Sequence, residues 1–131
     1  MWKGKDEYAV IVENSNQKTL NFVDLKTLSV VDHLDLDFAP GFSGFDADGK
    51  LWICAKGQDL LYRYTLLMGK WTQDLVLPTE NDPHAFYFLN DEVWLVHQKQ
   101  NTVAVLDRAS GTKLKTIAVG LKPNAILYLP E

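Results

Sequence analysis

Four side chains of the types that bind divalent metal ions stand beside short apolar runs of this chain: Glu13, Asp82, His84 and His97. Carboxylate and imidazole groups are common ligands of zinc and related ions. A simpler interpretation competes, because Asp82-Pro83-His84 has the composition of an ordinary turn and His97 begins a polar link. We favour this structural interpretation, and we expect neither a resident metal nor another cofactor.

Other catalytic arrangements have no support in the residues. No serine lies in a nucleophile elbow, no glycine-rich loop leads from a strand into a helix, and no Cys/His pair is credible. The single cysteine, Cys54, is expected to be a small buried apolar side chain. Residues 46–49 resemble the start of a calcium loop but lack its third acidic position and its closing glutamate. A hairpin turn with Gly49 in the left-handed conformation explains them better.

Charge and hydropathy limit the possible partners. The 131 residues include 13 Lys and Arg against 17 Asp and Glu, a formal net charge of −4. Without a run of Lys or Arg, this balance argues against binding to nucleic acid or to an anionic membrane. The sequence has no secretion-type apolar region near its start and no apolar stretch long enough to cross a bilayer. We expect a cytoplasmic protein, or an extracellular or surface protein if the chain is a fragment.

A repeated element must position these residues. Three apolar runs, 9–12, 51–54 and 93–96, begin 42 residues apart, and each is too short for a helix and bounded by polar residues. Each run therefore predicts a strand buried on both faces. Two further strands follow each run, and a fourth begins with proline, which suits the first residue of a strand. These further strands are predicted at 19–24, 29–36, 40–45, 60–65, 71–77, 83–88, 102–107, 113–119 and 123–129.

Four short antiparallel strands every 40 to 43 residues are typical of a β-propeller blade. We expect a single all-β domain over 1–131, with repeats at about 8–49, 50–91 and 92–131. Residues 59–71 also have apolar spacings that suit a helix, but the equivalent stretches alternate like strands, so we predict strands there. Trp52 and Trp94 occupy the same position in adjacent units and are expected to pack between blades. Trp2 and Trp71 are better candidates for exposed aromatic surfaces.

The third unit also carries the residues of a known repeat. Its VWLV (93–96), NTVAVLD (101–107), Gly111, IAVG (117–120) and Pro123 resemble the YVTN-type propeller repeat, a relative of the NHL and lactonase-like propellers. The resemblance covers the third unit well, the first moderately and the second loosely, and implies a WD40-like propeller fold. Trp94 and His97 stand where that family usually has tyrosine and asparagine. The kinship with lactonase-like propellers also implies one possible activity, hydrolysis at a divalent metal in the pore.

The order of the predicted strands is shifted by one relative to a blade. The chain starts on a second strand, and 123–129 is a first strand without a blade of its own. Three blades cannot close a ring, so we expect a half propeller that closes to six blades in a strand-exchanged homodimer. The start at Met1 and the strand count favour a complete chain over a fragment of a longer propeller. The residues expected at the closure are Tyr8, Val10, Val12, Pro123, Ala125, Ile126 and Leu127.

Propeller ligands usually bind at the mouth of the pore, between the loops that lead into the innermost strands. We expect a non-catalytic recognition or assembly module that binds a protein, a peptide or a glycan there. Two alternatives stay open: a lactonase-type hydrolase with a divalent metal in the pore, and a structural subunit of a surface or virion assembly. The residues expected at the pore mouth are Glu13, Phe42, Asp82, His84, His97 and Asn124.

Overall fold

Short strands rich in β-branched and aromatic residues dominate the chain, as the 42-residue period predicts. The computed structural model describes residues 4–12, 17–80 and 83–129, so Glu13 and Asp82 lie outside the described residues. Its elements are η1 (Lys5–Glu7), β1 (Tyr8–Val12), β2 (Thr19–Asp24), β3 (Ser29–Asp35), β4 (Pro40–Phe45), β5 (Leu51–Ala55), β6 (Leu60–Leu67), β7 (Lys70–Pro78), β8 (Ala85–Leu89), β9 (Glu92–His97), η2 (Gln98–Gln100), β10 (Thr102–Asp107) and β11 (Lys113–Ala118).

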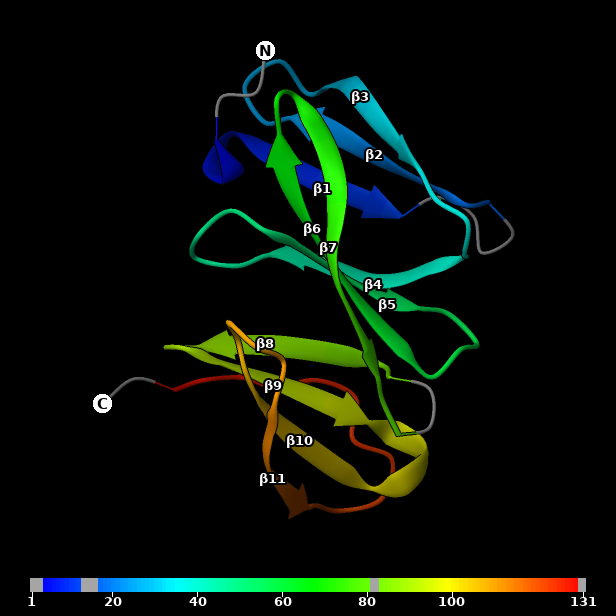
Figure 1. Ribbon diagram of the computed structural model, residues 1–131, viewed down its shortest axis with the longest axis vertical. Coiled ribbons are helices and arrows are strands. Elements are labelled where there is room, and N and C mark those ends of the chain that lie inside the picture. The colour runs from blue at the N-terminus through cyan, green and yellow to red at the C-terminus, as the bar shows by residue number, and fades with distance from the viewer. Residues whose placement is uncertain (1–3, 13–16, 81–82, 130–131) are drawn as a thin grey trace.

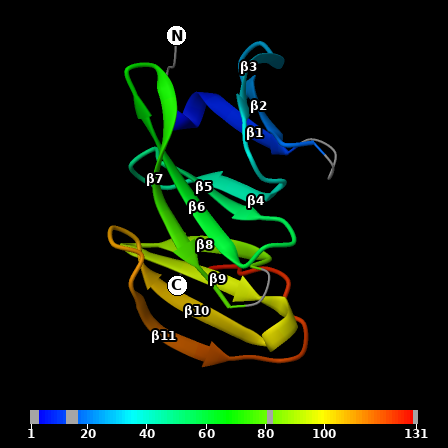
Figure 2. The same ribbon diagram turned by 45° about the vertical axis from the view of Figure 1, so that its right-hand side comes forward.

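The strands form three antiparallel sheets in which each strand pairs with its neighbours in sequence. The first sheet has the order β1-β2-β3, the second β4-β5-β6-β7 and the third β8-β9-β10-β11. The three sheets follow one another along the long axis of the molecule (Figure 1), and the rotated view keeps the same order (Figure 2). The predicted order of strands is therefore observed, including a first sheet with one strand fewer than the others.

Two apolar cores lie between successive sheets, because the alternating side chains of each strand face a neighbouring sheet on one side. Leu20 and Phe22 of β2 point from the first sheet to the second, where they meet Leu51 and Ile53. Between the second and third sheets, Trp52 is the largest member of the core, as predicted for blade packing. All five residues of β5 are buried, because both of its faces are covered. Cys54 is one of them, as predicted.

Three details differ from the sequence-based predictions. The link after β9 is not a simple loop, because residues 98–100 form the short helix η2, followed by Asn101 in the left-handed conformation. Residues 123–129 form no strand in the described part of the chain. Trp71 is not an exposed platform: its ring stacks on Phe22 at 5.7 Å between the first and second sheets. An aromatic side chain on β7 is long enough to cover the edge of that core.

No helix in the described ranges is long or apolar enough to cross a bilayer.

Candidate functional site

Two of the residues predicted at the pore mouth, Phe42 and His84, lie on or beside the first strand of a sheet, and Asn124 lies in the C-terminal segment. Phe42 lies on β4 with 46% of its surface exposed, and its ring meets Phe86 of β8 edge to face at 4.8 Å. His84 immediately precedes β8, is exposed, and lies 2.6 Å from Asn124 through its Nε2 and the amide Oδ1. The structure therefore brings His84 and Asn124 into contact and places Phe42 against β8 of the third sheet.

His97 occupies a different environment from the pore-mouth position that we predicted. The β9 strand extends to include it, and its side chain is 2% exposed in the space between the second and third sheets. Burial lowers the pKa of the imidazole; Glu80 and Asp59 oppose this shift, and Lys113 adds to it. His97 is therefore a neutral inter-sheet side chain, because alternation along β9 turns it to the face that carries Leu95.

The residues expected at the ring closure divide between the two ends of the molecule. Tyr8 is buried and Val10 half-buried on β1, and Val12 belongs to the same strand, although nothing is described of its side chain. Ile126 packs on Val96 and Val103 of the third sheet, on the face turned away from the second sheet. The other residues of the C-terminal segment are half-buried Pro123 and exposed Ala125 and Leu127.

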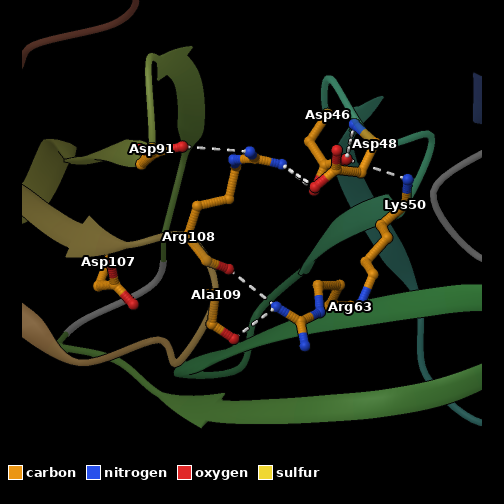
Figure 3. A pocket seen from close by; sticks show the side chains of 8 residues that line it. All are labelled: Asp46, Asp48, Lys50, Arg63, Asp91, Asp107, Arg108 and Ala109. Carbon is orange, nitrogen blue, oxygen red and sulfur yellow. Dashed lines mark hydrogen bonds and ion pairs between the residues drawn. The ribbon is translucent and has the colours of Figure 1, made fainter.

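A cluster of charged side chains lines a cavity between the second and third sheets (Figure 3). The Arg108 Nη1 lies 2.9 Å from Asp48 and 3.4 Å from Asp46, and its Nη2 lies 3.5 Å from Asp91. We call these four residues the Arg108 clamp. Burial lowers the pKa of the Arg108 guanidinium, but Asp48 and Asp46 more than offset this effect, so the net shift is upward.

Asp46 is the most buried carboxylate of the clamp, and local turn chemistry positions it. Its Oδ1 accepts hydrogen bonds from the backbone N–H of Asp48 and Lys50 at 2.9 and 3.0 Å, which closes the predicted hairpin turn. Gly49 has a φ of 80° in this turn, as its left-handed position requires. The Oδ2 accepts a hydrogen bond from the indole of Trp52 at 2.9 Å. Asp46 is 2% exposed, so these donors replace the water that the carboxylate would otherwise bind.

Arg63 joins the same two sheets from the other side of the cavity. Its Nη1 donates hydrogen bonds to the carbonyl oxygens of Arg108 and Ala109 at 2.8 and 3.0 Å, and its Nε binds Asp74 at 2.9 Å. The guanidinium also lies over the Trp52 ring, 5.5 Å from the ring centre. Both arginines therefore hold the β10–β11 turn of one sheet against the other.

The partners of these charges indicate a structural role for the cluster. A cavity of about 340 Å³ separates its side chains. Each carboxylate of the clamp already faces a guanidinium, so it is poorly placed to act as a base. Among the described residues, no three His, Cys, Asp or Glu side chains are arranged to hold a metal ion. Sequence reasoning missed the cluster, since Asp46 and Asp48 were interpreted only as turn residues.

Solved structures with a similar fold are β-propeller proteins. Hydrazine synthase from Kuenenia stuttgartiensis matches with a TM-score of 0.75 and 16% identity, over 91% of this chain and 35% of that one. AztD from Citrobacter koseri matches with a TM-score of 0.69 and 16% identity, over 89% of this chain and 34% of that one. Hsv2 from Kluyvelomyces marxianus matches with a TM-score of 0.50 and 9% identity, over 93% of this chain and 51% of that one.

These matches show the fold alone. The chain spans about a third of the length of the first two structures, so its three sheets correspond to part of a propeller. No protein-family model matches the chain, and no curated protein matches it in sequence. The YVTN-type assignment therefore stays a prediction, while the β-propeller architecture rests on the sheets and on the structural matches.

Proposed function

We propose that this chain is a non-catalytic recognition and assembly module, half of a six-bladed propeller that closes its ring with a second copy of itself. The observation that carries the proposal is the open inner edge of the first sheet. This sheet has three strands where the other two have four, and β1 pairs only with β2 among the described strands. Unpaired N–H and C=O groups on such an edge are ready to pair with another strand.

The C-terminal segment has the properties of the missing strand. Residues 123–129 follow the third sheet as 40–45 and 83–89 follow the first and second, and each of these segments begins with proline. The segment lies outside every sheet and exposes large apolar side chains: Leu127 is 82% exposed, Leu129 75% and Tyr128 51%. Pairing with a β1 edge would satisfy its backbone groups and remove these side chains from water.

A second copy is the partner that the arrangement favours. The first and third sheets lie at opposite ends of the molecule, and the C-terminal segment runs beside the third sheet (Figure 1). The segment therefore lies far from the β1 of its own chain. Two chains related by a two-fold axis along the pore would each donate one segment and together provide six blades, within the usual range for propellers.

Ligand recognition is assigned to the residues around the axis of that ring. The first strands of propeller blades line the pore, which would bring Phe42, His84 and Asn124 of both copies near its mouth. An exposed aromatic ring, an imidazole and an amide suit a protein, a peptide or a glycan, which combine apolar surface with many hydrogen-bonding groups. The clamp lies between two sheets, so it supports the rigidity of this surface.

Sedimentation equilibrium of the full chain and of residues 1–122 tests the closure. We expect a dimer for the full chain and a monomer of lower stability for the shortened one, because removing the segment leaves the β1 edge unpaired. Leu127→Asp should weaken the dimer by about tenfold or more, whereas Leu28→Asp, at a β2–β3 turn residue that is 77% exposed, should not. A full chain that stays monomeric, or a shortened chain that dimerises with unchanged stability, contradicts the proposal.

Metal analysis of protein purified without chelators tests the non-catalytic assignment. We expect no stoichiometric metal in the wild type or in His84→Ala. A stoichiometric divalent metal that is lost in His84→Ala would instead favour the hydrolase, because His84 would then be a ligand in the pore.

A further inference from the structure

A second cavity, of about 370 Å³, opens between the end of β7 and the third sheet, and its lining residues differ from those of the cavity at the clamp. Its volume lies at the lower end of the range for small-molecule sites, roughly 300 to 1,000 Å³. Most of its wall is apolar, and few polar groups interrupt it. Leu77, Leu95 and Leu106 form its apolar wall, and His97, Thr79 and Lys113 are among its polar residues.

Two polar side chains in this wall have no hydrogen-bond partner. Both ring nitrogens of His97 and the hydroxyl of Thr79 are buried and unsatisfied. His97 is 2% exposed, so bulk water does not provide the missing partners. A buried polar atom without a partner costs stability, and native proteins keep few of them. Both side chains line the cavity, and an occupant that donates and accepts hydrogen bonds would satisfy them.

The charges at the cavity limit the kind of occupant. The Lys113 ammonium and the Glu80 carboxylate pair with each other at 3.2 Å, and both side chains are about half exposed. A charged ligand would have to break this pair or enter the apolar wall without a counter-ion, which is costly. The imidazole of His97 is neutral, so it offers one N–H donor and one nitrogen acceptor. The Thr79 hydroxyl can also both donate and accept hydrogen bonds.

We propose that this cavity binds a small uncharged molecule with an apolar body and a hydroxyl group, which hydrogen-bonds to His97 and Thr79 while its body contacts Leu77, Leu95 and Leu106. A hydroxyl is the smallest group that donates and accepts at once. The site lies within a single chain, so it does not depend on the proposed ring closure.

Titration of the full-length protein with p-cresol, followed by amide and histidine-ring NMR signals, tests the proposal. We expect saturable shifts centred on residues 77–80, 95–97 and 104–106, with a dissociation constant on the order of 1 mM or tighter for a ligand of this size. Toluene has the same body without the hydroxyl, so it should bind about tenfold more weakly. Benzoate, which carries a charge, should not compete.

Variants distinguish the two hydrogen-bonding groups from the apolar wall. Thr79→Val keeps the shape of the side chain and should weaken p-cresol binding several-fold, and His97→Leu should weaken it about tenfold. Thr72→Val, on an exposed part of β7, is the matched control and should bind as the wild type does. The proposal is overturned if p-cresol gives no saturable shifts, if toluene binds equally well, or if neither variant weakens binding. In each of those cases the cavity holds ordered water or nothing.

Discussion

The two inter-sheet contacts of this molecule follow from the same repeat, yet they are built from different chemistry. Between the first and second sheets, aromatic rings stack: Phe22 on Trp71 at 5.7 Å, and Phe38 on Tyr62 at 4.0 Å with an angle of 7° between the ring planes. This contact depends on apolar burial and ring packing, which are insensitive to salt and to pH.

Between the second and third sheets, an apolar core around Trp52 is combined with buried charges. The Arg108 clamp and Arg63 connect the turns of the two sheets, and a cavity with unsatisfied polar atoms lies nearby. The 42-residue period determines where strands lie, whereas single residues outside the period determine how neighbouring sheets hold together. Four sets of substitutions, in order of decreasing expected effect, can test this difference.

Disrupting the aromatic contact between the first and second sheets should cause the largest loss of stability. Phe22→Ala removes a side chain that is 1% exposed and leaves a cavity against Trp71, so we expect a loss of about 3 to 5 kcal/mol in the free energy of unfolding. Urea unfolding at two salt concentrations measures it, and the loss should not depend on salt. Phe42→Ala, at a half-exposed ring, is the control and should lose about 1 kcal/mol. Similar losses for both variants would contradict the assignment of the core.

Disrupting the Arg108 clamp should cause a smaller loss of stability, and this loss should depend on salt. Arg108→Met leaves the buried carboxylate of Asp46 without its cation, and we expect about 2 to 3 kcal/mol, less than for a fully buried pair because Arg108 is partly exposed. Adding Asp46→Asn should recover part of this loss, since it removes the unpaired charge.

Lys113→Met is the matched control for the clamp, because its ion pair with Glu80 is about half exposed. We expect a change below about 0.5 kcal/mol for it. Equal effects of Arg108→Met and Lys113→Met in urea unfolding would show that the clamp does not stabilise the contact between these sheets.

Two glycines in equivalent turns of the second and third repeats separate backbone strain from packing between sheets. Gly69 and Gly111 both have a φ of 78°. A Cβ at position 69 would meet nothing within 4 Å, whereas one at 111 would lie 2.5 Å from the Leu77 Cδ2 of the neighbouring sheet. Gly69→Ala should therefore cost about 1 kcal/mol and Gly111→Ala about 2 kcal/mol, measured by thermal unfolding. Leu77→Ala should reduce the difference between them.

The smallest expected effect on stability comes from protonation of His97 in acid, and it involves only the contact between the second and third sheets. Burial lowers the folded-state pKa of His97, so the folded state favours the neutral imidazole. The stability that the neutral imidazole contributes is complete above the unfolded-state pKa of about 6.5, and it is lost as the pH falls below that value. The wild type should lose stability relative to His97→Leu between about pH 7 and pH 5. Parallel stability curves for the two proteins would contradict a buried neutral imidazole.

Most of the strand arrangement could be predicted from the sequence, because apolar runs at a fixed period record burial directly. The strands predicted at 19–24, 40–45 and 102–107 coincide with β2, β4 and β10. The pattern reports the burial of residues along each strand, so the angle between sheets cannot be predicted from it. For this reason it did not predict that Arg108 meets Asp46, 62 positions earlier in the chain.

The environment of His97 was missed for a related physical reason. Polar residues after an apolar run usually mean an exposed link, and Lys99, which is exposed, follows this rule. His97 lies at the last position of β9 and turns to the covered face of the sheet. The alternation of Val93, Leu95 and His97 was a signal that could have placed it there, had the strand been extended by one residue.

The open edge of β1 has a consequence for how copies of this chain add to one another. In the proposed dimer, the donation of 123–129 to the β1 of another chain is a head-to-tail contact, and repeating such a contact forms a closed ring only when the rotation per chain divides a full turn. A half turn per chain closes after two copies. If the angle between consecutive sheets changed so that the ring no longer closed, the same contact would continue from chain to chain and form a helical filament. Variants with looser packing between sheets would thus form insoluble fibres and also unfold at lower temperatures.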